Sequence, residues 1–255
     1  MSFFRRDSDR VVFESVRLKG TGKLGVIKPD KDGCYTQVIG ALGAYNSRGD
    51  YYDFNAGVRF FKNDSSFMRK IQRGVLKAEQ GHPKRNGMSL HEYQERILRI
   101  EETLTCGTWR QIWLSNDDLK DEQGRKIIPI FGKIYPSGPF RDSLIHAFES
   151  PGEQVCFSIR SFTKDTPRNN GTYFKELLNI VTFDYVTEPG MYNAEKLLSP
   201  SIESIEEEVD IKSMINVLDS TPTASMESAT DTKEFRNQLA DIIEKETKKP
   251  SFMRW

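Results

Sequence analysis

The sequence predicts an α+β protein with mostly antiparallel strands, followed by a flexible C-terminal extension. Short apolar runs broken by glycine and Asp-Gly turns fill residues 9–61, which is typical of strands joined by tight connections. Two later segments have apolar residues at helical spacing. From residue 199 onward Ser, Thr, Pro and Glu dominate, which favours a tail rather than a core. A chain of 255 residues can bury one good-sized core with such a tail attached.

The N-terminal part is predicted to be rich in strands. Candidate strands are residues 11–13, 25–27, 35–40 and 54–61. The turn signals between them are Gly20, Gly22 and Asp32-Gly33. Residues 67–75 fit either a short helix or an extended approach to His82, and their pattern does not decide between the two.

The middle of the chain is predicted to alternate between helices and strands. Ser89 is a candidate helix N-cap, and the apolar residues after it recur at helical spacing until Cys106-Gly107. A second, shorter helix is expected over residues 142–149, before Pro151-Gly152. The expected strands are residues 108–114, 127–135, 155–160 and 178–186, with a polar loop over 164–171.

The C-terminal extension is expected to begin near residue 199, which leaves residues 1–198 as the folded domain. Residues 199–232 are predicted to be mobile and to lie outside the core. Two short amphipathic helices are expected in or after this segment, one with Ile211, Met214, Ile215 and Leu218 on one face and one with Phe235, Leu239, Ile242 and Ile243.

The overall composition favours a soluble protein, and we expect no cofactor. The 37 basic residues balance the 37 acidic residues, so no global positive field indicates nucleic acid as a partner. No apolar stretch approaches the roughly 20 residues that span a bilayer. Cys34, Cys106 and Cys156 are widely spaced, which predicts reduced thiols in a cytosolic compartment. The three histidines lack metal-site spacing, so we expect no metal.

Three residues far apart in the chain offer the chemistry of a serine hydrolase. His82 precedes Pro83 in a loop, whereas Ser158 and Asp184 lie in two predicted strands. Because alternate side chains of a strand share a face, Cys156, Ser158 and Arg160 point one way. By the same alternation Thr182, Asp184 and Val186 point together. If the two strands are neighbours, Ser158 and Asp184 can flank an imidazole from the His82 loop.

These residues would act as nucleophile, general base and orienting carboxylate. His82 would take the proton of Ser158, and Asp184 would fix the histidine tautomer. Backbone N–H groups near Ser158 or in residues 160–163, supported by Arg160, would stabilise the oxyanion. A serine in a strand, an aspartate near a strand end and a His-Pro loop also occur as plain structural residues. The chain has no GxSxG motif, which speaks against an α/β-hydrolase.

Three motifs in this order resemble the prohead (capsid maturation) proteases of tailed phages, a family related to the herpesvirus assemblins. They are the Gly- and Glu-containing run that ends in His82-Pro83, the apolar strand that ends in Ser158-Ile159-Arg160, and the strand with Asp184 shortly before Pro189-Gly190. The resemblance covers roughly residues 70–195. It implies a barrel-like antiparallel core surrounded by helices, as in the assemblin fold.

The resemblance also implies a function and a location. It implies a serine endopeptidase that acts in the host cytoplasm inside the prohead, with phage scaffold and capsid proteins as substrates. Such enzymes cut after glutamate in small-x-Glu motifs and process their own C-terminus, which here makes Glu203, Glu206 and Glu227 the candidate self-cleavage sites. The motif that ends in Glu149 lies in a predicted helix and should be protected. We also expect a homo-oligomer.

Two departures from the family pattern leave alternatives open. The family often has glycine after Ser-x-Arg, whereas Ser161 follows Arg160 here, so the oxyanion loop can differ. The assemblins use a second histidine as third catalytic residue, so Thr182 or Glu188 is an alternative to Asp184. A pocket for a substrate glutamate needs a basic residue. The candidates are Lys84, Arg85, Arg160 and Arg168.

Two other functions remain open at this point. A non-enzymatic capsid scaffold or internal structural protein would have a similar charged tail, and a degenerate protease would have a similar sequence. Nucleic-acid binding through basic residues is disfavoured by the balanced charge. Those residues are Arg5, Arg6, Arg69, Lys70 and Lys84.

Overall fold

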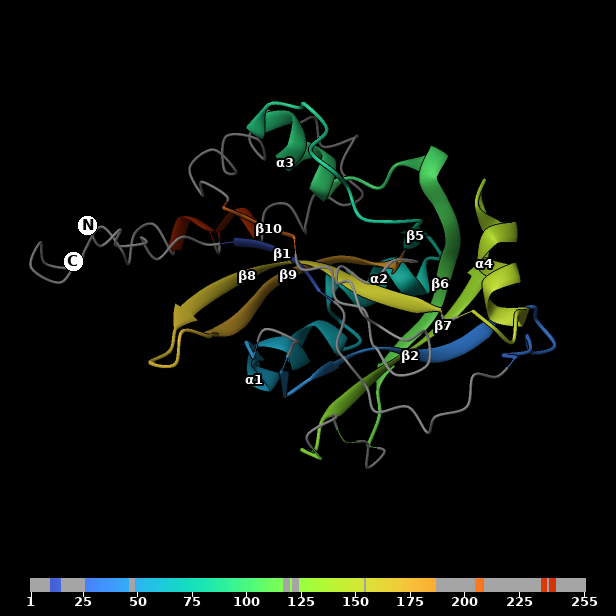
Figure 1. Cartoon of the computed structure of the whole chain (residues 1–255), viewed down its shortest axis with the longest axis horizontal. Coiled ribbons are helices and arrows are strands. Elements are labelled where there is room, and N and C mark those ends of the chain that lie inside the picture. The colour runs from blue at the N-terminus through green and yellow to red at the C-terminus, as the bar shows by residue number, and fades with distance from the viewer. Residues whose placement is uncertain are drawn as a thin grey trace, which may run out of the picture.

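The computed structural model describes residues 10–14, 26–45, 49–116, 120, 124–153, 155–186, 205–208, 235–237 and 239–241. These residues form a mixed α+β fold of two sheets with helices around them (Figure 1). The predicted α+β class is confirmed. Over the described ranges the strands form two separate sheets and no closed barrel.

The larger sheet has the strand order β10-β1-β8-β9-β4-β3. Its strands are β10 (Ile205–Glu208), β1 (Arg10–Glu14), β8 (Cys156–Pro167), β9 (Tyr173–Val186), β4 (Tyr51–Tyr52) and β3 (Ala44–Tyr45). All neighbours are antiparallel except β4, which runs parallel to β9. The long β8-β9 hairpin is the centre of this sheet, and the two predicted strands that carry Ser158 and Asp184 are therefore direct neighbours.

The smaller sheet has the antiparallel order β2-β7-β6-β5. Its strands are β2 (Tyr35–Leu42), β7 (Ile128–Pro136), β6 (Thr105–Leu114) and β5 (Lys77–Glu79). Strand β5 also approaches the larger sheet, because Gln80 forms a parallel bridge with Tyr185 of β9. The segment just before His82 thus connects the two sheets.

The core lies between the two sheets and is rich in aromatic rings. Trp109 of β6 contacts Phe157 of β8 and Phe183 of β9, with ring centroids 4.9 and 6.3 Å apart. Its indole N–H also donates a hydrogen bond to the carbonyl of Phe183. Tyr35 of β2 stacks on Phe148 at a centroid distance of 4.4 Å. This packing holds one face of the β8-β9 hairpin against the smaller sheet.

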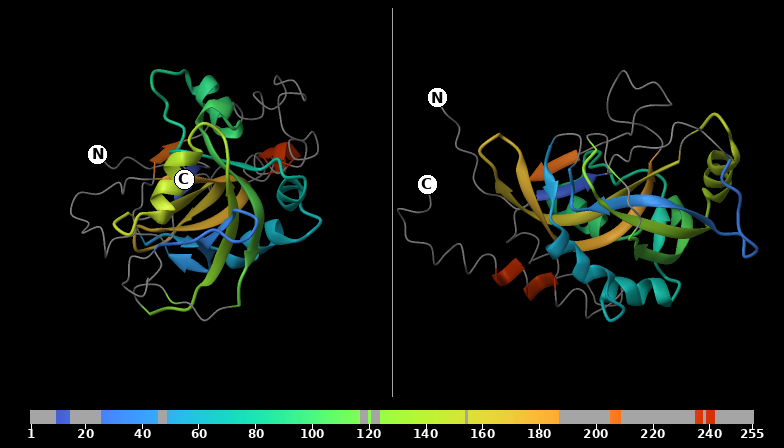
Figure 2. Two further views of the ribbon diagram at one scale, coloured as in Figure 1. Left: turned by 90° about the vertical axis from the view of Figure 1, so that its right-hand side faces the viewer. Right: turned by 90° about the horizontal axis from the view of Figure 1, so that it is seen from below.

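Helices surround the sheets. They are α1 (Phe54–Val58), the 3-10 turn η1 (Arg59–Phe61), α2 (Ser66–Gln72), α3 (Leu90–Leu98), the 3-10 turn η2 (Glu102–Leu104) and α4 (Arg141–Glu149). In Figure 2 the light-blue and cyan helices α1 and α2 run along one side of the strands. In the described part of the chain, no helix combines the length and the apolar character that crossing a membrane requires.

Two local predictions are corrected by helix geometry. The strand expected over residues 54–61 is wrong, because this segment forms α1 and η1. Asp53 caps α1 by accepting a hydrogen bond from the Ala56 N–H at 2.7 Å. Phe54, Val58 and Phe61 share a helical spacing that the strand prediction overlooked. For residues 67–75 the structure decides in favour of a helix, α2.

The helix predicted from Ser89 is confirmed at its start and shorter at its end. Ser89 and Glu92 form a capping box, in which each side chain binds the other's backbone N–H. The helix ends at Leu98 rather than near Cys106, and β6 begins at Thr105. The strand expected over residues 25–27 is not observed at Val26 and Ile27, where the Ile27 N–H binds the carbonyl of Phe148 instead.

Part of the predicted mobile tail is ordered against the domain. Residues 205–208 form strand β10, which pairs with β1. Residues 235–237 and 239–241 are helical, and Phe235 and Leu239 are buried. The ring of Phe235 lies 5.0 Å from that of Phe162 on β8. These contacts correct the expectation that the tail lies wholly outside the core. The helix predicted around Met214 lies outside the described residues.

Substitution of Gly132 tests the packing between the sheets. A Cβ at this position in β7 would lie 2.4 Å from Trp109 Cζ3 and 2.9 Å from Ile39 Cδ1, closer than carbon atoms can approach. Gly132→Ala should therefore lower the free energy of unfolding by about 1–3 kcal/mol in urea denaturation. Gly152→Ala is the matched control, since its Cβ meets nothing within 4 Å. Equal stability of the two variants would contradict this packing.

Candidate active site

The hairpin places Ser158 and Asp184 directly opposite each other. Ser158 of β8 pairs with Asp184 of β9, and Arg160 pairs with Thr182 on the same face. Directly opposite side chains in an antiparallel pair have Cβ atoms about 5 Å apart. Phe157 and Phe183 occupy the other face and pack in the core. The alternation expected from the sequence is confirmed, and the hairpin is apolar on one face and polar on the other.

The loop after β5 brings His82 to this polar face. The Gly81 N–H donates to the carbonyl of Tyr185 at 2.7 Å, which ties the loop to β9. Gly81 has φ +79°, a left-handed conformation that glycine adopts without a Cβ clash. On the other side of the loop, the hydroxyl of Tyr93 on α3 donates to the carbonyl of Pro83 at 3.2 Å. His82 is thus held between a strand and a helix.

His82 and Asp184 form a hydrogen-bonded pair. The distance between His82 Nδ1 and Asp184 Oδ2 is 3.1 Å. Because a carboxylate only accepts hydrogen bonds, this contact assigns the N–H to Nδ1. Nε2 is then the ring nitrogen with basic character. Ser158 and His82 are both neighbours of Asp184, one across the strands and one by this bond.

The Ser158 hydroxyl is buried and has no hydrogen-bond partner among the described residues. Ser158 is 2% exposed and His82 is 7% exposed. A buried hydroxyl without a partner is unfavourable for stability and is more often found where function requires it. The site is therefore covered in this conformation of the chain.

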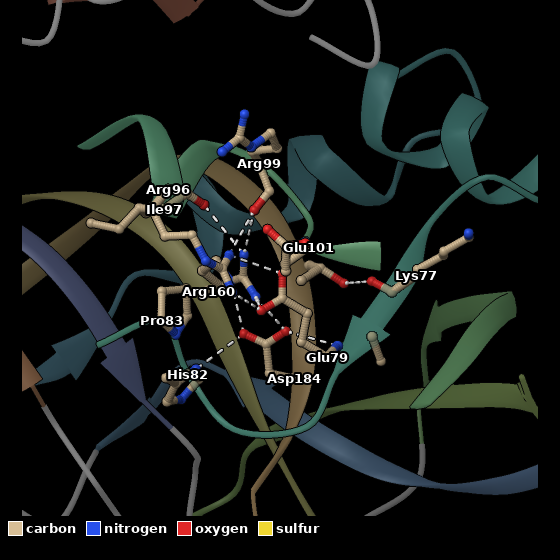
Figure 3. Close-up of polar contacts among 12 residues, drawn as sticks. Lys77, Glu79, His82, Pro83, Arg96, Ile97, Arg99, Glu101, Arg160 and Asp184 are labelled. Atoms are coloured by element: carbon tan, nitrogen blue, oxygen red, sulfur yellow. Dashed lines mark hydrogen bonds and ion pairs between the residues drawn. The ribbon is translucent and has the colours of Figure 1, made fainter. Parts of the chain in front are cut away.

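Asp184 is the centre of the polar cluster (Figure 3). Besides His82, its carboxylate binds the Arg160 guanidinium through Nε and Nη2, both at 2.8 Å. The backbone N–H of Glu79 donates to Oδ1 at 3.2 Å. Burial alone would raise the pKa of Asp184, but the charge of Arg160 and the bond to His82 outweigh it. The pKa of Asp184 therefore lies below its ordinary value, and the group is ionised.

Arg160 is completely buried, and all five of its N–H donors have acceptors. Two bind Asp184 and one binds Glu79, with a distance of 3.1 Å between Nη2 and Glu79 Oε2. Nη1 donates to the carbonyls of Ile97 and Arg99 at the end of α3. Burial would lower the pKa of Arg160, but the two carboxylates raise it overall. Arg160 therefore positions Asp184.

The role in substrate or oxyanion support that the sequence predicts for Arg160 stays a prediction, and the contacts of its side chain bear on it. A guanidinium that is 0% exposed and already bound by two carboxylates has no donor to offer a substrate. The backbone of residues 160–163 lies between two strands. Strand β1 pairs with this segment on one side and β9 on the other, with register shifts toward β9 between Arg160 and Ser161 and between Phe162 and Thr163.

The structure also locates the other candidates. Thr182 donates its hydroxyl to the carbonyl of Lys77 at 2.6 Å, so it braces β5 instead of contacting His82. Lys84 and Arg85 are exposed just after the His82 loop. Arg168 lies beyond the far end of β8, about 30 Å along the strand from Ser158.

The alternative carboxylate Glu188 and the candidate cleavage residues Glu203 and Glu227 lie outside the described residues, whereas Glu206 is in β10.

Two site residues were missed from the sequence, Glu79 and Arg96. Glu79 lies in β5 and is fully buried, and its carboxylate binds Arg96 of α3 at 3.0 and 2.5 Å. The signal for such partners was Arg160 itself, since a charge within an apolar strand needs buried counter-charges. No group of three or more His, Cys, Asp or Glu residues suited to a metal ion occurs in the described ranges.

Comparisons with known proteins identify the family of the chain. The sequence pattern of the peptidase S80 family matches residues 13–249. The chain belongs to the peptidase S80 family. A relative described as the capsid maturation protease of Pseudomonas phage phiKZ is 37% identical over 210 residues, which are 80% of this chain and 76% of that protein. This confirms the resemblance to phage capsid maturation proteases that the three motifs indicated.

A solved structure is also similar. The capsid assembly protease of bacteriophage T4 matches with a TM-score of 0.48 and 12% sequence identity, over 71% of this chain and 99% of that chain. The match to the peptidase S80 family continues past residue 198, so it includes most of the segment that the sequence predicted to be an extension.

The ionised state of Asp184 should be visible in the acid stability of the protein. Because its pKa is lowered in the folded chain, Asp184 stabilises the fold above the ordinary aspartate pKa, and this contribution is lost as the pH falls through the lowered value. Asp184→Asn should reduce the free energy of unfolding by about 3 kcal/mol or more at pH 7, and the deficit should shrink on acidification. Urea denaturation of both proteins between pH 7 and pH 3 measures it.

Asp142→Asn is the control for this measurement, because Asp142 is exposed on α4. Its effect should be small at every pH. A deficit of Asp184→Asn that stays constant down to pH 3 would contradict a stabilising charge on this group.

Proposed function

We propose that this peptidase is a serine endopeptidase with Ser158 as nucleophile, His82 as general base and Asp184 as orienting carboxylate. The observation that carries the proposal is the 3.1 Å bond from His82 to Asp184, together with the register that sets Ser158 opposite Asp184. In a serine hydrolase a carboxylate fixes the imidazole tautomer, and the other ring nitrogen accepts the proton of the serine hydroxyl. The bond of His82 to Asp184 supplies the first part, and we propose that the Ser158 hydroxyl turns to His82 Nε2 in the reaction.

In the proposed reaction Ser158 Oγ attacks the scissile carbonyl carbon while His82 Nε2 takes its proton. The tetrahedral intermediate then collapses, the C–N bond breaks, and His82 returns the proton to the leaving amine. Water, deprotonated by the same imidazole, hydrolyses the acyl-enzyme. Asp184 remains ionised throughout, because Arg160 keeps its pKa low. It stabilises the imidazolium each time the ring gains a proton.

The oxyanion donors are proposed to lie in the backbone around Ser158. Strand β1 runs beside β8 only as far as the pair of Glu14 with Ile159. Within the described residues, Cys156 to Ser158 therefore have a strand partner on the β9 side alone. N–H groups not used by a second strand are the ones that can face a tetrahedral intermediate.

The proposed biological context is capsid maturation in a phage. The relative from phage phiKZ is described as a capsid maturation protease, and the motif resemblance favours the same context. The substrates would then be scaffold and capsid proteins inside the prohead in the host cytoplasm, and the enzyme would work as a homo-oligomer. An assemblin-like arrangement of the fold is part of this proposal.

The full-length chain is proposed to be a latent form. Ser158 and His82 are both buried, so a substrate peptide reaches them only after part of the surrounding chain moves. Removal of the segment after residue 198 by self-cleavage is the proposed activating event. This segment is not inert, since β10 pairs with β1 and Phe235 packs on Phe162.

The proposed self-cleavage sites follow Glu203, Glu206 and Glu227. Glu206 lies opposite Val12, which in turn lies opposite Ser161 on β8. Two strand spacings and three residues along β8 place it about 14 Å from Ser158. Cleavage after Glu206 therefore requires β10 to leave the sheet, or a second copy of the enzyme to cut it.

Replacement of the proposed nucleophile is the direct test. In intact-mass measurements after expression and incubation, the wild-type chain should lose its C-terminus after one of the proposed glutamates. Ser158→Ala should keep the full-length mass, with cleavage slower by about 10³-fold or more. Its thermal stability should be equal or higher, because the substitution removes a buried hydroxyl without a partner.

Ser161→Ala is the matched control. Ser161 lies on the same strand, and its hydroxyl is also buried without a partner in the described part of the chain. This variant should be processed like the wild type. Processing that survives in Ser158→Ala would overturn the catalytic assignment, and a wild-type chain that keeps its full mass would favour a non-enzymatic scaffold.

Lys84 and Arg85 are proposed to bind the side chain of the substrate glutamate. Among the basic candidates they alone combine exposure with a position next to His82, since Arg160 is buried and Arg168 is distant. A charged hydrogen bond to a carboxylate favours it over the neutral amide. Lys84→Gln combined with Arg85→Gln should lower kcat/KM about tenfold for a peptide of residues 222–232.

The matched substrate for this prediction is the same peptide with glutamine in place of Glu227. Its cleavage, already slower, should be unchanged in the double variant. Arg168→Gln serves as the protein control and should leave both peptides unaffected. If the double variant keeps the wild-type ratio of kcat/KM between the two peptides, Lys84 and Arg85 do not bind the substrate glutamate.

A further inference from the structure

Four buried charged residues form one connected cluster beside the proposed catalytic residues. They are Glu79 of β5, Arg96 of α3, Arg160 of β8 and Asp184 of β9, with Arg96 the most exposed at 8%. Each residue comes from a different element, and Figure 3 shows their side chains converging. Buried charges are tolerated only when counter-charges and hydrogen bonds are complete.

Glu79 is the link between Arg96 and the proposed catalytic carboxylate. Its Oε1 accepts from Arg96 Nη1 at 3.0 Å and from the Glu101 N–H at 2.6 Å. Its Oε2 lies 2.5 Å from Arg96 Nη2 and 3.1 Å from Arg160 Nη2. Its own backbone N–H binds Asp184 Oδ1. Glu79 thus holds Asp184 directly through the backbone and indirectly through Arg160.

Helix α3 braces the same cluster from one side. The carbonyls of Ile97 and Arg99 at its C-terminal end accept from Arg160, where the helix dipole favours a positive charge. Arg96 Nη1 also donates to the Arg99 carbonyl at 3.0 Å. Tyr93 of the same helix binds the carbonyl of Pro83, next to His82. Helix α3 therefore contacts both the loop that carries His82 and the arginine that binds Asp184, and it also carries Arg96.

The cluster is electrically balanced. Two guanidinium groups and two carboxylates sum to zero net charge, so the balance changes only when His82 gains a proton. The elements around His82 carry several titratable or charged side chains. They include Cys156 and Arg160 on β8, Asp184 and Tyr185 on β9, Glu79 on β5, Cys106 on β6, Tyr93 and Arg96 on α3, and Lys84 and Arg85 after His82 itself.

The side chains of Cys106 and Tyr185 stay neutral at neutral pH. Burial raises the pKa of the Cys106 thiol far above its ordinary value, and the nearby Asp184 charge adds to this effect. Burial also raises the pKa of Tyr185 to about 12. The buried charges of the cluster that reaches His82 through Asp184 are those of Glu79, Arg96, Arg160 and Asp184.

We propose that Glu79 and Arg96 are positioning residues of the peptidase reaction, which orient Asp184 through Arg160 and set the charge balance around His82 during proton transfer. This inference rests on the proposed roles of Ser158, His82 and Asp184. Loss of Glu79 leaves Arg160 attracted to Asp184 alone and adds one net positive charge beside the imidazole. Loss of Arg96 adds one net negative charge.

The two neutralising substitutions should shift the pH profile in opposite directions. A positive charge disfavours the imidazolium, so Glu79→Gln should move the acidic limb of kcat/KM to lower pH. A negative charge favours the imidazolium, so Arg96→Gln should move the limb to higher pH. Each shift should be about half a pH unit or more. The double variant restores zero net charge, and its limb should return close to that of the wild type.

Both substitutions should also slow the reaction by lowering kcat. Misorientation of the carboxylate should reduce kcat about 10- to 100-fold in the single variants, with little change in KM, because neither residue is placed to contact substrate. Glu79→Asp keeps the charge and shortens the side chain, so it should lower kcat without moving the acidic limb. A residue that only supports the fold would not shift the pH limb.

The experiment applies two probes to protein that is expressed as the full chain and then incubated. The first is the peptide of residues 222–232, and the second is a fluorophosphonate that transfers its phosphonyl group to Ser158 with loss of fluoride. The rate of this modification, measured against pH, reports activation of the hydroxyl independently of peptide specificity. Glu102→Gln is the control, because Glu102 is an exposed carboxylate paired with Lys77 of β5, and it should leave the limb in place.

The outcomes separate this inference from the proposed function. A wild-type chain that is not modified at Ser158 would refute the catalytic assignment itself. If Ser158 is modified in the wild type but the acidic limb of the pH profile does not move in Glu79→Gln and Arg96→Gln, only the positioning role of Glu79 and Arg96 is overturned. If Glu79→Gln does not fold, Arg96→Gln decides alone, since it leaves Glu79 bound to Arg160 and to the Glu101 N–H.

Discussion

The paired hydrogen bonds between Arg160 and Asp184 are the interaction on which the site depends. Both groups are fully buried on adjacent strands, and each would be severely unfavourable without the other. The guanidinium uses its remaining donors on Glu79 and on the end of α3. These bonds bring β5, α3 and the β8-β9 hairpin together, and they leave one Asp184 oxygen directed at His82. The same contacts thus organise the fold and hold Asp184 beside His82.

The hairpin can carry this cluster because its other face is anchored in the apolar core. Phe157 and Phe183 pack against Trp109 of the smaller sheet, which fixes the position of the strands between them. The polar face therefore does not have to supply apolar contacts of its own. Side chains on paired strands are held more precisely than side chains on loops, which suits the role that we propose for Ser158. His82 alone comes from a loop, and that loop is held by Gly81 and Pro83 on opposite sides.

The chain belongs to the peptidase S80 family, yet Ser158 is buried in this structure. An active peptidase must admit an extended peptide to its nucleophile, whereas this conformation buries Ser158 and His82, the residues that we propose as nucleophile and base. The tail is part of this conformation, because β10 extends the larger sheet and Phe235 contacts Phe162. The proposed latency therefore requires these tail contacts to change before a substrate reaches Ser158.

The sequence by itself determined the α+β class, the Ser89 helix start and the pairing face of Ser158 with Asp184, because these follow from local spacing and strand alternation. It overlooked the helical spacing of Phe54, Val58 and Phe61, since a short apolar run also fits a strand. It could not assign Arg160, Glu79 and Arg96, because the partners of a buried charge come from segments distant in the chain. Only tertiary packing brought β5 and α3 to the hairpin, and burial there turned Arg160 from a candidate substrate ligand into the support of Asp184.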